Sequence, residues 1–300
     1  MDTERALQEF LQTQRLPESF LAHAQEWFMP LAASLVEHRQ AADRPIVIGI
    51  NGSQGSGKST LASLLSLLFS REYGLHSIAL SIDDFYLTRA QRQALAEEVH
   101  PLLATRGVPG THDVELLGDT LQRLAGAKHP VPVPRFDKSR DDRVPTSRWR
   151  SVDPPLDIII LEGWCLGVRA QQAPQLGIPA NELERDEDPR GLWREYVNAR
   201  LQADYHGLYD LIDIWVMLQA PSFDSVFRWR LEQEQKLAQQ EPQPGSQVMS
   251  AAQIARFIQH YQRLTQQALD TLPASVHYLF KLDEQRRIRE AIQPRPVNLP

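Results

Sequence analysis

The sequence predicts an α/β protein with a doubly wound parallel β-sheet, in which helices cover both faces of the sheet. The first observation is that apolar, β-branched runs of strand length alternate with segments whose apolar residues repeat at helical spacing. The second is that the run at residues 46–50 passes through a glycine-rich turn into a helical pattern at 61–69. Parallel strands need helix-sized crossover connections, so this alternation favours a parallel sheet.

The bulk composition limits the classes of function. The chain has 300 residues, 42% of them hydrophobic, and no apolar run approaches the roughly 20 residues needed to cross a bilayer. The net charge of −6 argues against nucleic acid as a partner, because proteins that bind a phosphate backbone need a basic face. The N-terminal residues lack the apolar segment of a secretory signal, and the lone Cys165 cannot form an intramolecular disulfide. We therefore expect a cytoplasmic protein that binds neither nucleic acid nor membrane.

Residues 1–44 are predicted to form a helical extension that packs on one globular domain over residues 45–300. Apolar residues follow two helical stripes in this extension, and Pro17 and Pro30 are expected to interrupt the helices. A partner-binding arm is the alternative for this segment.

The glycine-rich turn after the first strand carries the strongest functional signal in the chain. Residues 52–59 fit the pattern G-x-x-x-x-G-K-[ST], in which glycines let consecutive backbone N–H groups converge on a polyphosphate at a helix N-terminus. This predicts a sheet of the P-loop NTPase type. Lys58 is expected to reach the β- and γ-phosphates, and the Ser59 hydroxyl a magnesium ion. The residues predicted to bind the nucleotide are Gly52, Ser53, Gln54, Gly55, Ser56, Gly57, Lys58, Ser59 and Thr60.

Two acids, Asp83 and Asp84, follow a second apolar strand predicted at residues 76–82. In parallel α/β sheets, the carboxyl ends of the strands open onto the ligand-binding crevice. One carboxylate can accept the proton of an attacking hydroxyl while the other approaches the metal or holds the first. We predict Asp83 to be the base; the alternative for Asp84 is a helix N-cap.

The segment 106–113 has the pattern of neither a strand nor a helix, and its glycines and proline fix a loop. Arg106 and His112 lie in this loop and are candidates for a wall of the substrate site. A loop histidine that only makes hydrogen bonds is the alternative for His112. Asp113 is predicted to cap a helix at 114–125.

Residues 135–143 form the most charged stretch, with four basic and three acidic side chains. A solvated loop is the ordinary interpretation of such a run. However, the Pro/Val alternation before it and Phe136 within it should anchor the loop, so that its cations are held in place. Arg135, by bidentate pairing, and Lys138, as a point charge, are then candidates to bind a small acidic substrate.

The apolar strand predicted at residues 157–161 ends in Glu162. In a protein with a phosphate-binding loop, an acid at this position is typical of the carboxylate that supports magnesium, usually through water. Ser59 and Glu162 are therefore predicted to bind Mg²⁺; pairing with a helix end is the alternative for the acid. ATP and Mg²⁺ are the cofactors that these residues imply.

The remaining patterns complete the predicted sheet. They are an exposed insertion at 170–191, a helix at 192–211, a strand at 213–219, a helix at 223–239, a flexible connection at 240–250, a helix at 251–272 and a strand at 276–282. We predict that the 223–239 helix is a lid, in which an arginine neutralises charge on the transferred phosphoryl group. Arg228 and Arg230 are the candidates, and only one should reach the phosphates, because residues two apart point to different faces.

With these segments in place, the chain resembles the P-loop small-molecule kinases, a group that includes uridine kinase, phosphoribulokinase and bacterial pantothenate kinase. In that group the first Asp of an Asp-x-Phe-Tyr-like element acts as base, which corresponds to Asp83 here. More narrowly, the chain resembles the plant and fungal D-glycerate 3-kinase family over residues 45–285. The matching segments are SIDDFYLT at 81–88, RG at 106–107 with GTHD at 110–113, PRFDKS at 134–139, LEGWCLG at 161–167, and WRL at 229–231 with Glu234.

The resemblance implies an ATP- and magnesium-dependent kinase that phosphorylates a hydroxyl of a small acidic metabolite, with the 3-hydroxyl of D-glycerate as first choice. Asp83 and Lys58 would then be catalytic, with one of the two arginines, and Tyr86 would contact the substrate. Two other classes stay open. These are a kinase of another small molecule, such as pantothenate or a nucleoside, and a P-loop NTPase that hydrolyses nucleotide as a switch. The oligomeric state also stays open, with a monomer as first choice, and no motif marks the adenine site.

Overall fold

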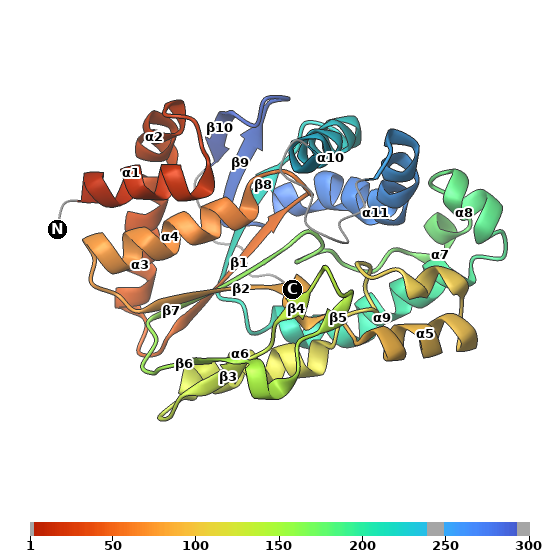
Figure 1. Cartoon of the computed structure of the whole chain (residues 1–300), viewed down its shortest axis with the longest axis horizontal. Coiled ribbons are helices and arrows are strands. Elements are labelled where there is room, and N and C mark those ends of the chain that lie inside the picture. The colour runs from red at the N-terminus through yellow and green to blue at the C-terminus, as the bar shows by residue number, and fades with distance from the viewer. Residues whose placement is uncertain (1–2, 239–248, 293–300) are drawn as a thin grey trace.

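A six-stranded β-sheet forms the centre of the computed structural model, which describes residues 3–238 and 249–292 (Figure 1). The strands are β1 (Ile46–Gly52), β2 (Ser77–Ser81), β7 (Ile158–Gly163), β8 (Ile214–Gln219), β9 (Tyr278–Leu282) and β10 (Ile288–Ile292). They lie in the order β10-β9-β8-β1-β7-β2, and the first five in chain order are mutually parallel. The predicted strands and their parallel arrangement are confirmed. The sequence analysis missed β10, an antiparallel edge strand, because charged residues break its apolar alternation.

Helices cover both faces of the sheet, because the central strands are apolar in both directions. In β1, Ile46, Ile48 and Ile50 join one hydrophobic core while Val47 joins the other. The first core is built with α1 (Thr3–Gln14), α2 (Ser19–His23), α3 (Met29–Ala41), α4 (Lys58–Glu72) and α10 (Phe223–Ala238). The second core is built with α5 (Arg89–Glu98), α6 (Val114–Gly126), α9 (Leu192–Tyr209) and α11 (Ala251–Thr271). The predicted doubly wound architecture is therefore confirmed.

Residues 3–41 pack on the core that contains α4. Pro17 separates α1 from α2, as predicted. Pro30, in contrast, lies in the first turn of α3, directly after a π-helical turn at Ala24–Phe28, so the helix continues through it and the predicted interruption is wrong. A proline in a first turn is tolerated, since its missing N–H removes no necessary hydrogen bond there.

Replacing Phe28 by Ala should lower the free energy of unfolding by about 3–5 kcal/mol. Phe28 is buried, and its ring meets that of Phe280 on β9 edge-on at 5.9 Å, so its loss leaves a cavity between the extension and the sheet. Urea unfolding measures the change. The half-buried Phe20, 6.2 Å from Phe28, is the matched control and should lose clearly less when replaced by Ala. Equal losses for both variants would show that the extension is not anchored by Phe28.

Most residues of the segment 170–191 are exposed, as predicted, but the segment also has helices and buried ion pairs that were not predicted. It contains α7 (Ala173–Leu176) and α8 (Glu182–Glu187), and the fully buried Glu184 accepts a hydrogen bond from Arg263 of α11 at 2.5 Å. Asp188, also buried, pairs with Arg194 at 3.0 Å. The segment shows no apolar period because paired charges, which sequence patterns cannot reveal, hold it in place.

Two short hairpins carry the charged stretch. β3 (Val131–Val133) pairs with β6 (Arg150–Val152), and between them β4 (Phe136–Asp137) pairs with β5 (Asp142–Arg143). Phe136 is buried, so the predicted anchoring of this segment is confirmed. The strands themselves were not predicted, because two or three residues are too few to show a period.

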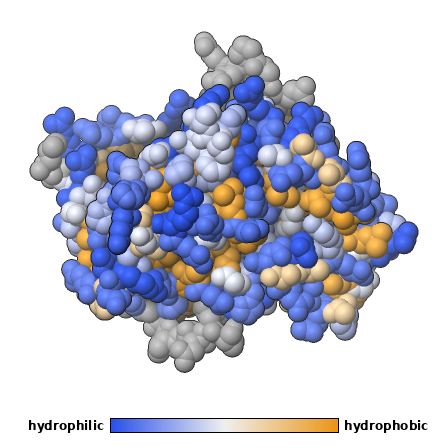
Figure 2. All heavy atoms as spheres, turned by 90° about the horizontal axis from the view of Figure 1, so that it is seen from below, coloured by the Kyte–Doolittle hydropathy of each residue, from blue (hydrophilic) through white to orange (hydrophobic). Residues whose placement is uncertain are grey.

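The surface is mixed in character. On the face shown in Figure 2, hydrophobic residues lie in patches bordered by hydrophilic ones. Among the described residues, the large hydrophobic side chains that are exposed are Ile178 and Leu192. In the part of the chain that the structure describes, no helix has the length and apolar character to span a membrane. The predicted connection at 240–250 lies largely outside the described residues.

Candidate active site

The glycine-rich turn joins β1 to α4 with the backbone bent as a phosphate loop requires. Gly55 and Gly57 have φ angles of +79° and +94°, which side-chain-bearing residues rarely adopt. A Cβ at Gly52 would lie 2.5 Å from Ser56 Oγ. The hydroxyls of Ser53 and Ser56 are buried and have no hydrogen-bond partner among the described residues. Orphaned donors at the N-terminus of α4 fit the oxygens of a polyphosphate.

Ser59 and Glu162 meet at the mouth of this loop. The Ser59 hydroxyl donates to Glu162 Oε1 at 2.8 Å, and Lys58 Nζ lies 3.7 Å from Oε2. Glu162 is buried, and its Oε2 has no hydrogen-bond partner in the described part of the chain. A hydroxyl and a carboxylate form a hard oxygen donor set, which fits a Mg²⁺ ion that takes its other ligands from phosphate and water. The described residues hold no group of three or more His, Cys, Asp or Glu side chains around a potential metal.

Asp83 lies in a 3₁₀ turn, Ile82–Phe85, at the carboxyl end of β2. The Tyr86 hydroxyl donates to its Oδ1 at 2.8 Å, and Lys138 Nζ donates to its Oδ2 at 2.6 Å. Burial raises the pKa of Asp83, but the charges of Lys138 and Lys58, with the two hydrogen bonds, outweigh burial and lower the pKa to about 2. The carboxylate is therefore ionised at neutral pH and lies within the electrostatic influence of the phosphate-loop lysine.

Asp84 does not cap a helix, so the alternative considered for it is wrong. Ser81 caps the 3₁₀ turn instead, through a hydrogen bond from Asp83 N. Asp84 Oδ1 accepts a hydrogen bond from the Phe136 backbone N–H at 3.1 Å, which ties the turn to β4. Burial raises the pKa of Asp84. Its function is thus to hold the charged hairpin beside Asp83.

His112 lies behind Tyr86 rather than on the open surface of its loop. Its ring stacks on that of Tyr86 at 4.6 Å, and its Nδ1 is 2.7 Å from the Tyr205 hydroxyl. Burial lowers the pKa of His112 to about 4, so the ring is neutral at pH 7. These contacts agree with the alternative in which His112 makes internal hydrogen bonds. Asp113 caps α6 as predicted and also pairs with Arg143 at 3.0 Å.

The cations proposed for the substrate differ in their surroundings. Arg106 forms an ion pair with Asp141 and lies 5.5 Å over the Phe136 ring, so its charge is already matched. Lys138 contacts Asp83 as described above. Arg135 is exposed, and its side chain makes no hydrogen bond or ion pair with another described residue.

The two arginines of the predicted lid point in different directions, as expected. Arg228 is half exposed and pairs with Glu284, just beyond β9, at 2.9 Å. Arg230 is mostly buried, pairs with Glu234 at 2.6 Å and lies 5.8 Å over the Phe257 ring of α11. The Phe257 ring packs on Tyr261, whose hydroxyl donates to the Arg106 carbonyl. Arg230 therefore lies on the side of the loop that was predicted to form a wall of the substrate site.

Tyr261 on α11 is a site residue that the sequence analysis missed. Its hydroxyl donates to the Arg106 carbonyl at 3.0 Å, and its ring meets Trp164 edge-on at 4.9 Å. A Cβ at Gly107 would collide with the tyrosine hydroxyl. No motif surrounds Tyr261 in the sequence, since an aromatic residue at helical spacing is ordinary core.

Arg286 is a second residue that the sequence analysis missed. The turn between β9 and β10 holds it at φ +66°, and its Nε donates to the Gly55 carbonyl of the phosphate loop at 2.8 Å. Its guanidinium also lies 5.2 Å over the Trp229 ring of α10. The turn that leads into the antiparallel edge strand therefore holds the phosphate loop at Gly55 through this hydrogen bond.

Replacing Arg286 by Gln should raise the KM for ATP about 3- to 10-fold, with a smaller change in kcat, because a charge-assisted hydrogen bond to the loop is lost. Initial rates over a range of ATP concentrations measure this. Arg289, which is exposed on the neighbouring strand, is the matched control, and its replacement by Gln should leave KM unchanged. If both variants changed KM equally, the effect would come from net charge rather than from the loop contact.

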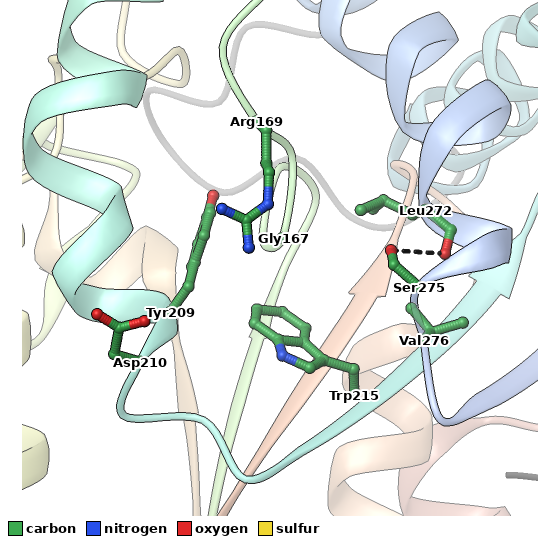
Figure 3. A pocket seen from close by; sticks show the side chains of 8 residues that line it. All are labelled: Gly167, Arg169, Tyr209, Asp210, Trp215, Leu272, Ser275 and Val276. Atoms are coloured by element: carbon green, nitrogen blue, oxygen red, sulfur yellow. Dashed lines mark hydrogen bonds between the residues drawn. The ribbon is translucent and has the colours of Figure 1, made fainter. Parts of the chain in front are cut away.

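A small pocket also lies away from these residues, between α9 and α11 (Figure 3). The side chains of Arg169, Tyr209 and Trp215 face one another around it, and its volume is about 40 Å³. Pockets for nucleotide-sized ligands measure roughly 300–1,000 Å³. None of the site residues predicted from the sequence lines it.

Comparison with known proteins gives consistent similarities. Residues 47–173 match the family model described as the phosphoribulokinase / uridine kinase family. The chain is 36% identical over 244 residues to the uncharacterized kinase mug58 of Schizosaccharomyces pombe. The matched region covers 78% of this chain and 84% of that protein. It is also 36% identical over 242 residues to the chloroplastic D-glycerate 3-kinase of Arabidopsis thaliana, covering 77% of this chain but only 49% of the plant protein. The chain thus spans about half the length of that relative.

Similarity extends to a solved structure. The D-glycerate 3-kinase from Cryptococcus neoformans superposes with a TM-score of 0.73 at 26% sequence identity, over 90% of this chain and 98% of that chain. The likeness therefore extends over most of this chain and nearly all of that one.

Proposed function

Because this chain belongs to the phosphoribulokinase / uridine kinase family of P-loop kinases, we propose that it transfers the γ-phosphoryl group of ATP to the 3-hydroxyl of D-glycerate. It is an ATP-dependent small-molecule kinase. The acceptor, the use of Mg²⁺ and the roles of individual residues are the content of the proposal. The relatives named D-glycerate 3-kinases support the choice of acceptor.

The observation that carries the proposal is the contact of Lys138 with Asp83 at the end of β2, next to the end of β7, where Glu162 lies 3.7 Å from Lys58. A base at the carboxyl end of β2 and a cation from the charged hairpin would contact two ends of one small molecule. The first would hold a hydroxyl and the second a carboxylate. A three-carbon hydroxy acid carries both groups within a few bonds, whereas a neutral nucleoside would leave Lys138 and the exposed Arg135 without an anion.

Phosphoryl transfer requires mainly positioning and charge stabilisation. In the proposed mechanism, the loop amides and Lys58 would hold the phosphates, and Ser59 and Glu162 would hold Mg²⁺. When bound, Mg²⁺ would neutralise charge on the phosphates. Asp83 orients the acceptor hydroxyl and accepts its proton, while Tyr86 fixes the carboxylate of Asp83. Arg230 neutralises charge on the transferred group.

A panel of acceptors tests the proposal. ADP release would be measured with D-glycerate, L-glycerate, pantothenate and uridine, each over a range of concentrations. D-Glycerate should give the largest kcat/KM. A larger value for pantothenate or uridine would assign the protein to another small-molecule kinase. ADP release that no acceptor stimulates would favour the alternative of a nucleotide-hydrolysing switch.

Other properties stay predictions of the sequence. They are a cytoplasmic location, a monomeric state, independence from nucleic acid and membranes, and the division into an extension over residues 1–44 and a kinase domain over residues 45–300. Size-exclusion chromatography with light scattering would test the monomeric state directly.

A further inference from the structure

Both carboxylate oxygens of Asp83 already hold a hydrogen-bond donor. Tyr86 donates to Oδ1 at 2.8 Å and Lys138 to Oδ2 at 2.6 Å. A hydroxyl that is to transfer its proton to this carboxylate needs one of the oxygens at hydrogen-bond distance. Each oxygen can accept a second hydrogen bond, but an oxygen that is paired with an ammonium is a weaker proton acceptor, so Lys138 hinders the transfer as long as it stays in place.

The two donors differ in their freedom to move. Tyr86 is buried, and its ring centroid lies 4.6 Å from that of His112 and 5.2 Å from that of Phe136. These two rings hold the tyrosine side chain in place. The side chain of Lys138 is 60% exposed, and that of Asp83 is 28% exposed. A lysine carries its charge on a flexible stem of four carbons, so its ammonium can move while the backbone of the turn stays in place. Lys138 is the donor that can leave.

Neighbouring cations do not share this arrangement. Arg143 donates to the Tyr86 carbonyl and to Asp113, and Arg106 pairs with Asp141, so both hold the scaffold together. Lys138, in contrast, has its described ion pair with the proposed base itself. Its position in the turn between β4 and β5 is fixed through the hydrogen bond that Asp84 accepts from Phe136. The hairpin thus holds one mobile cation over the base.

We propose that Lys138 is an exchange cation, which the carboxylate of an acidic acceptor draws away from Asp83 so that Asp83 becomes free to accept the proton of the acceptor hydroxyl. The inference rests on the proposed function. In the step itself, a bond forms between the acceptor oxygen and the γ-phosphorus, the bond from that phosphorus to the leaving oxygen of ADP breaks, and the hydroxyl proton passes to Asp83.

The exchange explains how an acidic acceptor is selected in turnover as well as in binding. A neutral polyol such as glycerol has the hydroxyls but cannot draw Lys138 away, so the base stays paired when glycerol binds. The lowered pKa of Asp83 agrees with this, because a carboxylate that holds an ammonium is a weak base. Removing the lysine should therefore help the neutral acceptor and harm the acidic one.

The test compares Lys138→Met with the unchanged protein, using D-glycerate and glycerol as acceptors. With D-glycerate, KM should rise and kcat/KM should fall, because the carboxylate loses its partner. With glycerol, kcat should rise about 10-fold, because the base is no longer paired. A lysine that only binds the substrate carboxylate would leave glycerol turnover unchanged, so the two roles differ in the sign of a measured effect.

The matched control is Arg140→Met, which removes a cation from the same turn. Arg140 is exposed and makes no side-chain contact with Asp83, so both acceptors should give the rates of the unchanged protein.

A second measurement needs no variant. Acetate should accelerate glycerol phosphorylation by the unchanged protein, since it supplies a separate carboxylate for Lys138.

Each outcome separates the inference from the proposed function. Glycerol turnover that is unchanged, lower or undetectable in Lys138→Met would overturn the exchange, and a lack of acceleration by acetate would count against it. In either case, activity with D-glycerate would leave the proposed function standing. An unchanged protein with no activity on D-glycerate would contradict the proposed function itself.

Discussion

Replacing Asp83 by Asn should lower kcat by about 10²- to 10⁴-fold, the range for loss of a positioned general base, and change the Kd for ATP by less than about 3-fold. The amide keeps the size of the carboxylate and can still accept a hydrogen bond from Tyr86, but it cannot take the hydroxyl proton. Single-turnover rates and a direct ATP titration measure the two quantities separately.

Asp119→Asn is the control for this experiment. Asp119 is exposed on α6 and pairs with Arg123 one turn away, so its replacement removes an acid of the same chemistry outside the site. Its kcat should be unchanged. Near-normal turnover of Asp83→Asn would show that Asp83 only orients the acceptor. A large loss of ATP affinity would instead assign Asp83 to the nucleotide or its metal.

Replacing Lys58 by Met should lower kcat by about 10²- to 10³-fold and also weaken ATP binding. Lys58 is the cation of the phosphate loop, so its loss removes stabilisation from both the bound phosphates and the transferred group. The same change leaves the buried Glu162, 3.7 Å away, without its cation. Kinetics, ATP titration and thermal unfolding together measure these effects.

Two further variants separate the causes. Lys281→Met removes an exposed lysine that pairs with Glu290 on the edge strand, and it should change none of the three quantities. The double variant Lys58→Met with Glu162→Gln should recover thermal stability, because no unpaired buried charge remains, but not activity. If activity returned together with thermal stability, Lys58 would be needed for the stability of the fold and not for phosphoryl transfer.

Local patterns in the sequence predicted much of the fold and the phosphate site. The strand, turn and helix at residues 46–72 are formed by adjacent residues, so the order of glycines, lysine and hydroxyl is sufficient to predict the loop. The central strands β1, β7 and β8 are apolar on both faces and appear as apolar runs. The acids that end β2 and β7 lie at one edge of the sheet for the same topological reason, since β2 and β7 are adjacent parallel strands.

The errors arose where polar residues determine the structure. Buried pairs such as Glu184 with Arg263 hold the segment 170–191, for which no helix and no buried ion pair was predicted. The edge strand β10 is half polar, so it has no apolar signature. Asp84 was considered as a cap, although its partner is the backbone of Phe136, 52 residues further along the chain.

By itself, the sequence determined that a nucleotide-phosphate loop is built into a parallel sheet and that acids follow two of its strands. Only the tertiary structure decided which residues from distant segments complete that site. Lys138 reaches Asp83 across 55 residues, and Arg286 reaches Gly55 across 231. The physical reason is that periodicity and turn chemistry act between near neighbours in the chain, whereas a long side chain finds its partner only after the sheet has brought remote loops to one edge.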